Sequence, residues 1–189
     1  SEATVSPPTL SFTSSNWNTP QTVTVTGVND DVDDGSVNST IAVAINTAGT
    51  GDSKYDLLSS QSVTVSTGDG DTSAFTISET GGSTAVSENG STDTFTVVLG
   101  SEPTGNVVFS LSDNDSDDSE ISLSLSTLTF TSSNWNTVQT VTVTGVNDNV
   151  SDGNVTSTIT VAINQGSTAD TKDDALSSRS VCVVTRDDA

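Results

Sequence analysis

The sequence LTFTSSNWNTVQTVTVTGVND at Leu128–Asp148 occurs a second time, as LSFTSSNWNTPQTVTVTGVND at Leu10–Asp30. Each copy holds two segments in which apolar residues alternate with Ser or Thr, a polar turn that carries one Trp, and an acidic turn. The two copies are offset by 118 residues, and the match runs without a gap from Ser1 and Ser119 to the C-terminus, with about two thirds of the positions identical. A repeat of this length predicts tandem copies of one structural unit.

The repeat divides the chain into two predicted domains. Residues 72–189 form a complete repeat, and residues 1–71 form a partial repeat that has no counterpart of Thr72–Asp118. The sequence TGDGD at Thr67–Asp71 is typical of a linker, because glycine leaves the backbone free to turn. We therefore place the boundary between Asp71 and Thr72.

Alternation of apolar and polar residues is the main structural signal in this sequence. It predicts strands of five to eight residues, among them Leu10–Phe12 as the start of one strand and Gln21–Val28 with Val23 and Val25 facing inward. The same pattern predicts that Cys182 is a small, buried or half-buried strand residue. No stretch shows the 3.6-residue period of a helix, so the expected fold is an all-β, antiparallel β-sandwich with seven or eight strands in a complete unit.

The charge of the chain restricts its partners. Twenty-five acidic residues face four basic ones, which gives a net charge of −21. Nucleic acids and anionic membranes both need a basic footprint, so neither is an expected partner, and no long apolar run predicts membrane insertion. The acidic residues are clustered in turns, which points to cations as the neutralising component.

The acidic turns have the chemistry of a calcium site. Alternate loops of a sandwich emerge at one end, so several turns can converge there, and Ca²⁺ takes six to eight oxygen ligands from Asp, Glu and backbone carbonyls. The run DNDSDDSE at Asp113–Glu120 is not an EF-hand loop, because it lacks Gly at its sixth position and Glu at its twelfth. Zinc is disfavoured, since the chain has no His and one Cys.

The alternative to a metal site is that these acidic turns are solvated loop tips. Catalytic carboxylates or a two-metal centre are disfavoured in a feature that recurs in tandem copies, so no enzymatic activity is expected.

Two groups of motifs resemble the Calx-beta domain family. Its opening strands resemble FTISE and SENGSTDTFTVVL in this chain, and its second half resembles LTFT, QTVTVTGVND and TITVAIN. The resemblance covers residues 72–188 and the latter half of a unit in residues 1–71, and it is strongest to versions found in tandem in large secreted bacterial surface proteins. It implies an immunoglobulin-like sandwich that binds several Ca²⁺ ions at one end.

The resemblance also implies which side chains hold the ions. In the complete repeat these are Glu88, Asp148, Asp152, Asp187 and Asp188, with Asp113, Asp115, Asp117 and Asp118 in a further ligand loop. In the partial repeat they are Asp30, Asp34, Asp69 and Asp71.

The expected function is mechanical. The sequence predicts a calcium-binding repeat that stiffens an extracellular, adhesin-like protein at a bacterial cell surface, with neighbouring repeats of the same chain as partners. Two alternatives stay open. One is a subunit of a self-assembling extracellular filament or sheath, in which copies of the chain exchange strands because the partial repeat lacks its opening strands. The other is a sugar- or protein-binding module, which would need an exposed aromatic cluster, with Trp17, Tyr55 and Trp135 as the candidates.

Overall fold

The computed structural model describes residues 2–114, 120–147, 151 and 153–188. Its contacts divide the chain into two compact units. The first unit comprises Ser1–Asp30 and Asp34–Gly70, and the second comprises Asp31–Asp33 and Asp71–Ala189. The division after Gly70 lies one residue before the boundary expected from the sequence. The second unit also takes in three residues of the first acidic turn, which the sequence did not predict.

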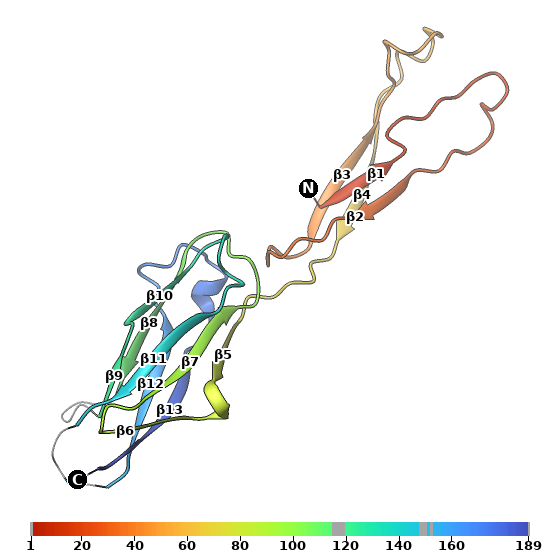
Figure 1. Ribbon diagram of the computed structural model, residues 1–189. Coiled ribbons are helices and arrows are strands. Elements are labelled where there is room, and N and C mark those ends of the chain that lie inside the picture. The colour runs from red at the N-terminus through yellow and green to blue at the C-terminus, as the bar shows by residue number, and fades with distance from the viewer. Residues whose placement is uncertain (1, 115–119, 148–150, 152, 189) are drawn as a thin grey trace. The chain divides into compact units, whose positions relative to one another are not determined.

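The second unit is a sandwich of two β-sheets (Figure 1). One sheet has the strand order β10 (Thr127–Phe130), β8 (Val107–Asp113), β12 (Val155–Ile163), β13 (Arg179–Arg186) and β6 (Thr84–Ser87). The other has the order β5 (Phe75–Glu79), β7 (Thr92–Leu99), β11 (Gln139–Gly145) and β9 (Ile121–Leu123). The strands pair antiparallel, except that β13 and β6 are parallel. Two short 3₁₀ turns, η1 (Thr80–Gly82) and η2 (Asp173–Ala175), interrupt the loops. The predicted all-β, immunoglobulin-like sandwich is confirmed.

The core of the second unit lies between these sheets. It is built from the apolar residues of each alternating strand, because successive side chains of a strand point to opposite faces. Phe109 on β8 packs edge-on against Phe75 on β5, with ring centroids 4.8 Å apart, and against Phe130 on β10 at 5.9 Å. These edge-to-face contacts join β5 of one sheet to β8 and β10 of the other.

The first unit has counterparts of β9, β11, β12 and β13, in the same register. Strand β1 (Ala3–Ser6) pairs with β2 (Thr24–Gly27), and β3 (Val37–Val43) pairs with β4 (Gln61–Thr67). Ala3 faces Gly27, just as Ile121 faces Gly145 at the equivalent positions of the second unit. These two hairpin-like pairs form separate two-stranded sheets.

Three strand-level predictions are wrong. Residues 9–12 form no strand, although the equivalent β10 does, because β10 is held by β8 and the first unit has no counterpart of β8. Val23 and Val25 are each 37% exposed, because the first unit has no counterparts of β5 to β8, which complete both sheets around Val141 and Val143. Cys182 is exposed, because its neighbours Val181 and Val183 take the inward positions of β13. No helix in the described ranges combines the length and the hydropathy needed to cross a bilayer.

Candidate functional site

Two buried carboxylates mark one end of the second unit. Glu88 follows β6, and its N–H donates to the carbonyl of Arg186 at the end of β13 (3.1 Å). Glu120 precedes β9, and its carbonyl accepts from the N–H of Val146 just after β11 (3.0 Å). Both residues are only 2% exposed. Carboxylates are rarely this deeply buried, so these two residues mark this end as a candidate site.

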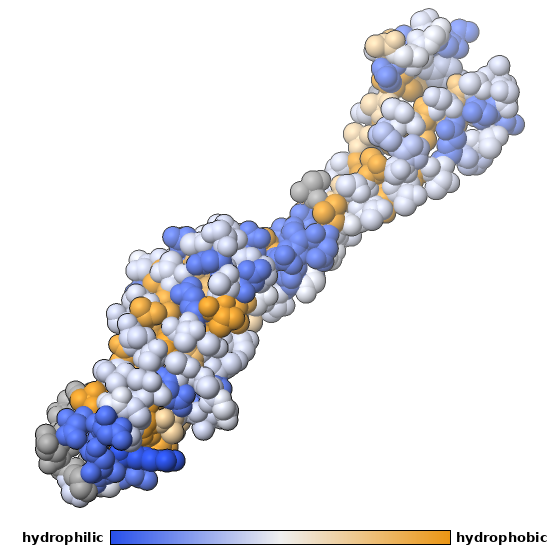
Figure 2. Space-filling model, in the orientation of Figure 1, coloured by the Kyte–Doolittle hydropathy of each residue, from blue (hydrophilic) through white to orange (hydrophobic). Residues whose placement is uncertain are grey.

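The acids after the last strand lie at the same end. Asp187 Oδ2 accepts hydrogen bonds from Gly153 N–H (2.9 Å) and from the hydroxyl of Ser151 (3.4 Å). Asp188 Oδ1 accepts from the side-chain amide of Asn147 (3.2 Å). The acidic turn is therefore tied to the end of β13, as the sequence predicts for converging loops. Figure 2 shows hydrophilic atoms gathered at this end of the second unit.

The other predicted ligands of this end are described in part. Asp113 is exposed at the end of β8, where it pairs with Ile159. Asp115, Asp117, Asp118, Asp148 and Asp152 lie outside the described residues. Within the described residues, no three or more Asp, Glu or Cys side chains are grouped so that they could hold a metal ion. The calcium ligand set thus remains a prediction.

The first unit repeats the contact between the last strand and the acidic turn. Asp69, the counterpart of Asp187, accepts from the N–H of Gly35, the counterpart of Gly153, at 2.6 Å. Both glycines have positive φ, +78° and +81°, a conformation that residues with a Cβ disfavour. Two further predicted ligands, Asp30 and Asp34, belong to this unit, whereas Asp71 belongs to the second.

The donors gathered at the ends of β11 and β13 suit a hard cation. They are carboxylate oxygens, which Ca²⁺ prefers, and the chain has no His. The ligands would be Glu88, Glu120, Asp187 and Asp188 together with the acidic loops that the resemblance implies. Glu120 was missed as a candidate, although it closes the acidic run DNDSDDSE.

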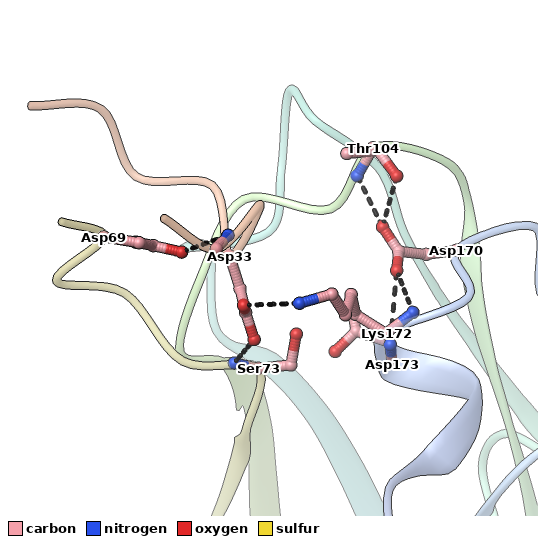
Figure 3. A network of polar contacts seen from close by, with 8 residues as sticks. Asp33, Asp69, Ser73, Thr104, Asp170, Lys172 and Asp173 are labelled. Atoms are coloured by element: carbon pink, nitrogen blue, oxygen red, sulfur yellow. Dashed lines mark hydrogen bonds and ion pairs between the residues drawn. The ribbon is translucent and has the colours of Figure 1, made fainter. Parts of the chain in front are cut away.

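A second acidic cluster, formed by Asp33, Asp170 and Asp173 with Lys172, was not predicted (Figure 3). Within the second unit, Asp33 accepts from Ser73 N–H (2.8 Å) and from the ammonium of Lys172 (3.0 Å). These two contacts, the Ser73 N–H first, hold the pKa of Asp33 below its usual value. The carbonyl of Asp31 also accepts from Glu102 N–H (2.6 Å).

Asp170 organises the loop that carries Lys172. Its Oδ2 accepts from the N–H and the hydroxyl of Thr104 (2.6 and 2.7 Å), and its Oδ1 accepts from the N–H groups of Lys172 and Asp173 (2.8 and 3.2 Å). Burial acts to raise the pKa of Asp170, but these hydrogen bonds outweigh it and the pKa lies below its usual value. Asp170 therefore acts as a charged cap that joins two loops.

Asp173 is the destabilising member of the cluster. It is 2% exposed, and its Oδ1 is buried without a hydrogen-bond partner among the residues that the structure describes. Burial, followed by repulsion from Asp170 and Asp33, raises the pKa of Asp173 to about 6. The folded unit thus binds this proton more tightly than the unfolded chain does.

The raised pKa of Asp173 in the folded unit predicts how the stability of an Asp173→Asn variant depends on pH. Because the folded pKa is raised above the unfolded one, Asp173 lowers stability at neutral pH, and the penalty disappears as the pH falls through about 6 towards 4. The variant should gain about 1–2 kcal/mol of unfolding free energy at neutral pH and almost nothing near pH 4. Urea unfolding at both pH values measures the difference.

Asp170→Asn is the matched control, because it removes a carboxylate whose pKa lies below its usual value. It should destabilise the unit at neutral pH. An equal gain in unfolding free energy from Asp173→Asn at both pH values would contradict the raised pKa of Asp173.

Comparisons with known proteins add a likeness of architecture. No protein-family model matches the sequence, and no curated protein matches it. The chain is similar to the E. coli chaperone DraB, with 10% identity, a TM-score of 0.41, and coverage of 62% of this chain and 57% of that chain. It thus spans less than two thirds of the chaperone's length.

Two further structures are similar. The apo-form Calx CBD1 domain has 13% identity and a TM-score of 0.39, with coverage of 61% of this chain and 98% of that chain. The S-layer protein rSbsC(31-844) has 16% identity and a TM-score of 0.39, with coverage of 87% and 23%. At these identities the comparisons assign no function.

Proposed function

We propose that this chain is a calcium-binding, stiffening repeat of an extracellular, adhesin-like protein at a cell surface. The observation that carries the proposal is the convergence of Glu88, Glu120, Asp187 and Asp188 at one end of the second unit. The role proposed is structural and not catalytic.

Electrostatics supports a bound cation at this end. Arg186 is the one basic residue next to these acids among the described residues, and it is exposed, so the local charge is strongly negative. A divalent cation would remove the repulsion among these carboxylates. Extracellular calcium modules have dissociation constants of about 10⁻⁴–10⁻³ M, so millimolar external calcium would fill them.

The mechanical role follows from repetition. In an array of like units, ions at the unit ends would neutralise the acidic turns and restrict bending of the chain. The net charge of −21 supports the same role, because without cations it would oppose compact packing.

Thermal unfolding tests the proposal. Melting curves recorded by circular dichroism in EGTA, in CaCl₂ and in MgCl₂ should show a rise in Tm that is specific for calcium. A ligand at 100 times its Kd adds about 2.7 kcal/mol for each site, or roughly 10 °C for a unit of this size.

Variants that each remove one carboxylate charge show which residues carry the calcium-dependent shift in Tm. Glu88→Gln and Asp187→Asn should each reduce the calcium-dependent shift by at least about half, since each removes a full ligand charge. Glu102→Gln removes the same charge from the β7–β8 loop, away from the acidic end, and should leave the shift unchanged. A calcium shift that survives both ligand substitutions, or none in the parent chain, would refute the proposal.

A further inference from the structure

The first unit exposes residues that the second unit buries. Val23 and Val25 are 37% exposed, whereas their counterparts Val141 and Val143 are fully buried. The same contrast recurs at Val43 and Val161, at Val63 and Val181, and at Phe12 and Phe130. Figure 2 shows apolar atoms at the surface of the first unit. Because both residues of each pair are identical, the difference lies in what covers them.

The edges of the first unit's strands are open as well. In the second unit β11 pairs with β9 on one side and β7 on the other, and β12 pairs with β13 and β8. The equivalent β2 and β3 each pair on one side alone within the described residues 2–71. Unpaired backbone edges beside an apolar face form a surface that accepts further strands.

The second unit identifies the missing cover. Strands β5 to β8 supply the buried side chains that face the second half of the sandwich: Phe75, Val86, Phe95, Val97, Leu99, Val107, Phe109 and Leu111. Leu99 N–H also donates to the carbonyl of Trp135 (3.1 Å), which fastens β7 to the Trp-bearing turn. The counterpart Trp17 is 69% exposed.

The local geometry of the first unit is already formed for this contact. Gln21 donates to Ser11 carbonyl at 2.7 Å, as Gln139 does to Thr129 carbonyl at 2.8 Å. The registers of β1–β2 and β3–β4 equal those of β9–β11 and β12–β13. A covering segment would thus meet a surface that needs little rearrangement.

Copies of residues 1–189 cannot cover one another's exposed apolar faces by exchanging strands. Residues 1–189 hold two second halves, residues 1–71 and 119–189, but one first half, residues 72–118, which the second unit uses. An exchange of strands between copies would therefore uncover one face for each face that it covers.

We propose that the open face of the first unit binds a further first half-repeat, with the strand pattern of residues 72–118. The partner is thus a half-repeat with the strand pattern of residues 72–118, and not a second copy of residues 1–189.

The test is a chain in which a second copy of residues 72–118 is fused ahead of Ser1. Trp135→Phe in this chain leaves Trp17 as the single Trp reporter. Acrylamide quenching of Trp17 should fall several-fold relative to the unextended Trp135→Phe chain. The amides of β2 and β3 should become at least about tenfold more protected from hydrogen exchange, because open edges become paired.

Gly27→Ala supplies a matched control. In the second unit a Cβ on the equivalent Gly145 would lie 2.1 Å from Ser87 carbonyl oxygen, whereas a Cβ on Gly27 meets only the methyl group of Thr67 at 3.4 Å. Gly27→Ala should leave the unextended chain unchanged but abolish the protection of Trp17 in the fused chain.

Three outcomes would overturn the proposal. Trp17 could stay equally quenchable after fusion, or Gly27→Ala could leave the fused chain's protection intact. Alternatively, the unextended chain could form a dimer in sedimentation that already protects Trp17, which would assign the face to a second copy.

Discussion

Gly145→Ala should lower the unfolding free energy of the second unit by about 3 kcal/mol or more, because the new methyl group has no space. Its Cβ would lie 2.1 Å from the carbonyl oxygen and 2.7 Å from the carbonyl carbon of Ser87. These are backbone atoms, which cannot rotate away as a side chain can. Urea unfolding followed by Trp135 fluorescence, in a Trp17→Phe chain at fixed calcium, measures the loss.

The close approach has a structural cause. Gly145 N–H donates to Ser91 carbonyl (3.0 Å), so the turn between β6 and β7 lies directly over the end of β11. The Ala substitution would push this turn away and break that bond. Glu88 lies in the same turn, so the buried carboxylate would be displaced with it.

Gly27→Ala is the internal comparison, since Gly27 occupies the same place in the repeat without a β6–β7 turn above it. The effect on unfolding should be within about 0.5 kcal/mol, the usual range for an unconstrained surface position. If both substitutions cost the same, the loss at Gly145 would come from strand propensity and not from the contact with Ser87.

The sequence predicts strands well in this chain and burial less well. Alternation in QTVTVTGV, at Gln21–Val28 and in its second copy, located β2 and β11 to within a few residues, because the period of a strand is set by local backbone geometry. Burial depends on a partner sheet. Val23 and Val141 stand in the same local sequence, but only Val141 lies in complete sheets that include β5 to β8. The absence of a strand at residues 9–12 has the same cause. The equivalent β10 is hydrogen-bonded to β8, and the first unit has no counterpart of β8.

The two candidate sites also differ in how far the sequence predicts them. The convergence of Glu88 with the acids after β13 follows from the rule that alternate loops of a sandwich meet at one end. The cluster of Asp33, Asp170 and Lys172 joins residues more than 130 positions apart, which no local pattern reveals. One signal was present: the chain's two lysines, Lys54 and Lys172, occupy equivalent positions, each two residues after an Asp whose side chain accepts the lysine N–H.

Phe130→Ala should have the second large effect, a loss of about 3–5 kcal/mol from the second unit. Phe130 is fully buried on β10 and packs edge-on against Phe109, which in turn packs against Phe75. Removal of the ring leaves a cavity that three strands surround, and the rigid sheets relax into it only in part. A domain of this size has about 5–15 kcal/mol of stability in total, so the variant should be partly unfolded at 37 °C. Urea unfolding measured by circular dichroism reports the loss.

Phe12→Ala is its counterpart in the first unit and should cost less than about 1 kcal/mol, because the ring is 55% exposed and forms part of no strand. The two phenylalanines stand in nearly identical sequence, so the difference in cost measures the contribution of β5 to β8 to the core. Equal losses at both positions would mean that Phe12 is buried in solution by something the described residues do not include. A small loss at Phe130 would instead mean that β10 is not part of the cooperative core. With the added half-repeat in place, Phe12→Ala should become as costly as Phe130→Ala, because the ring would then meet its own counterpart of Phe109.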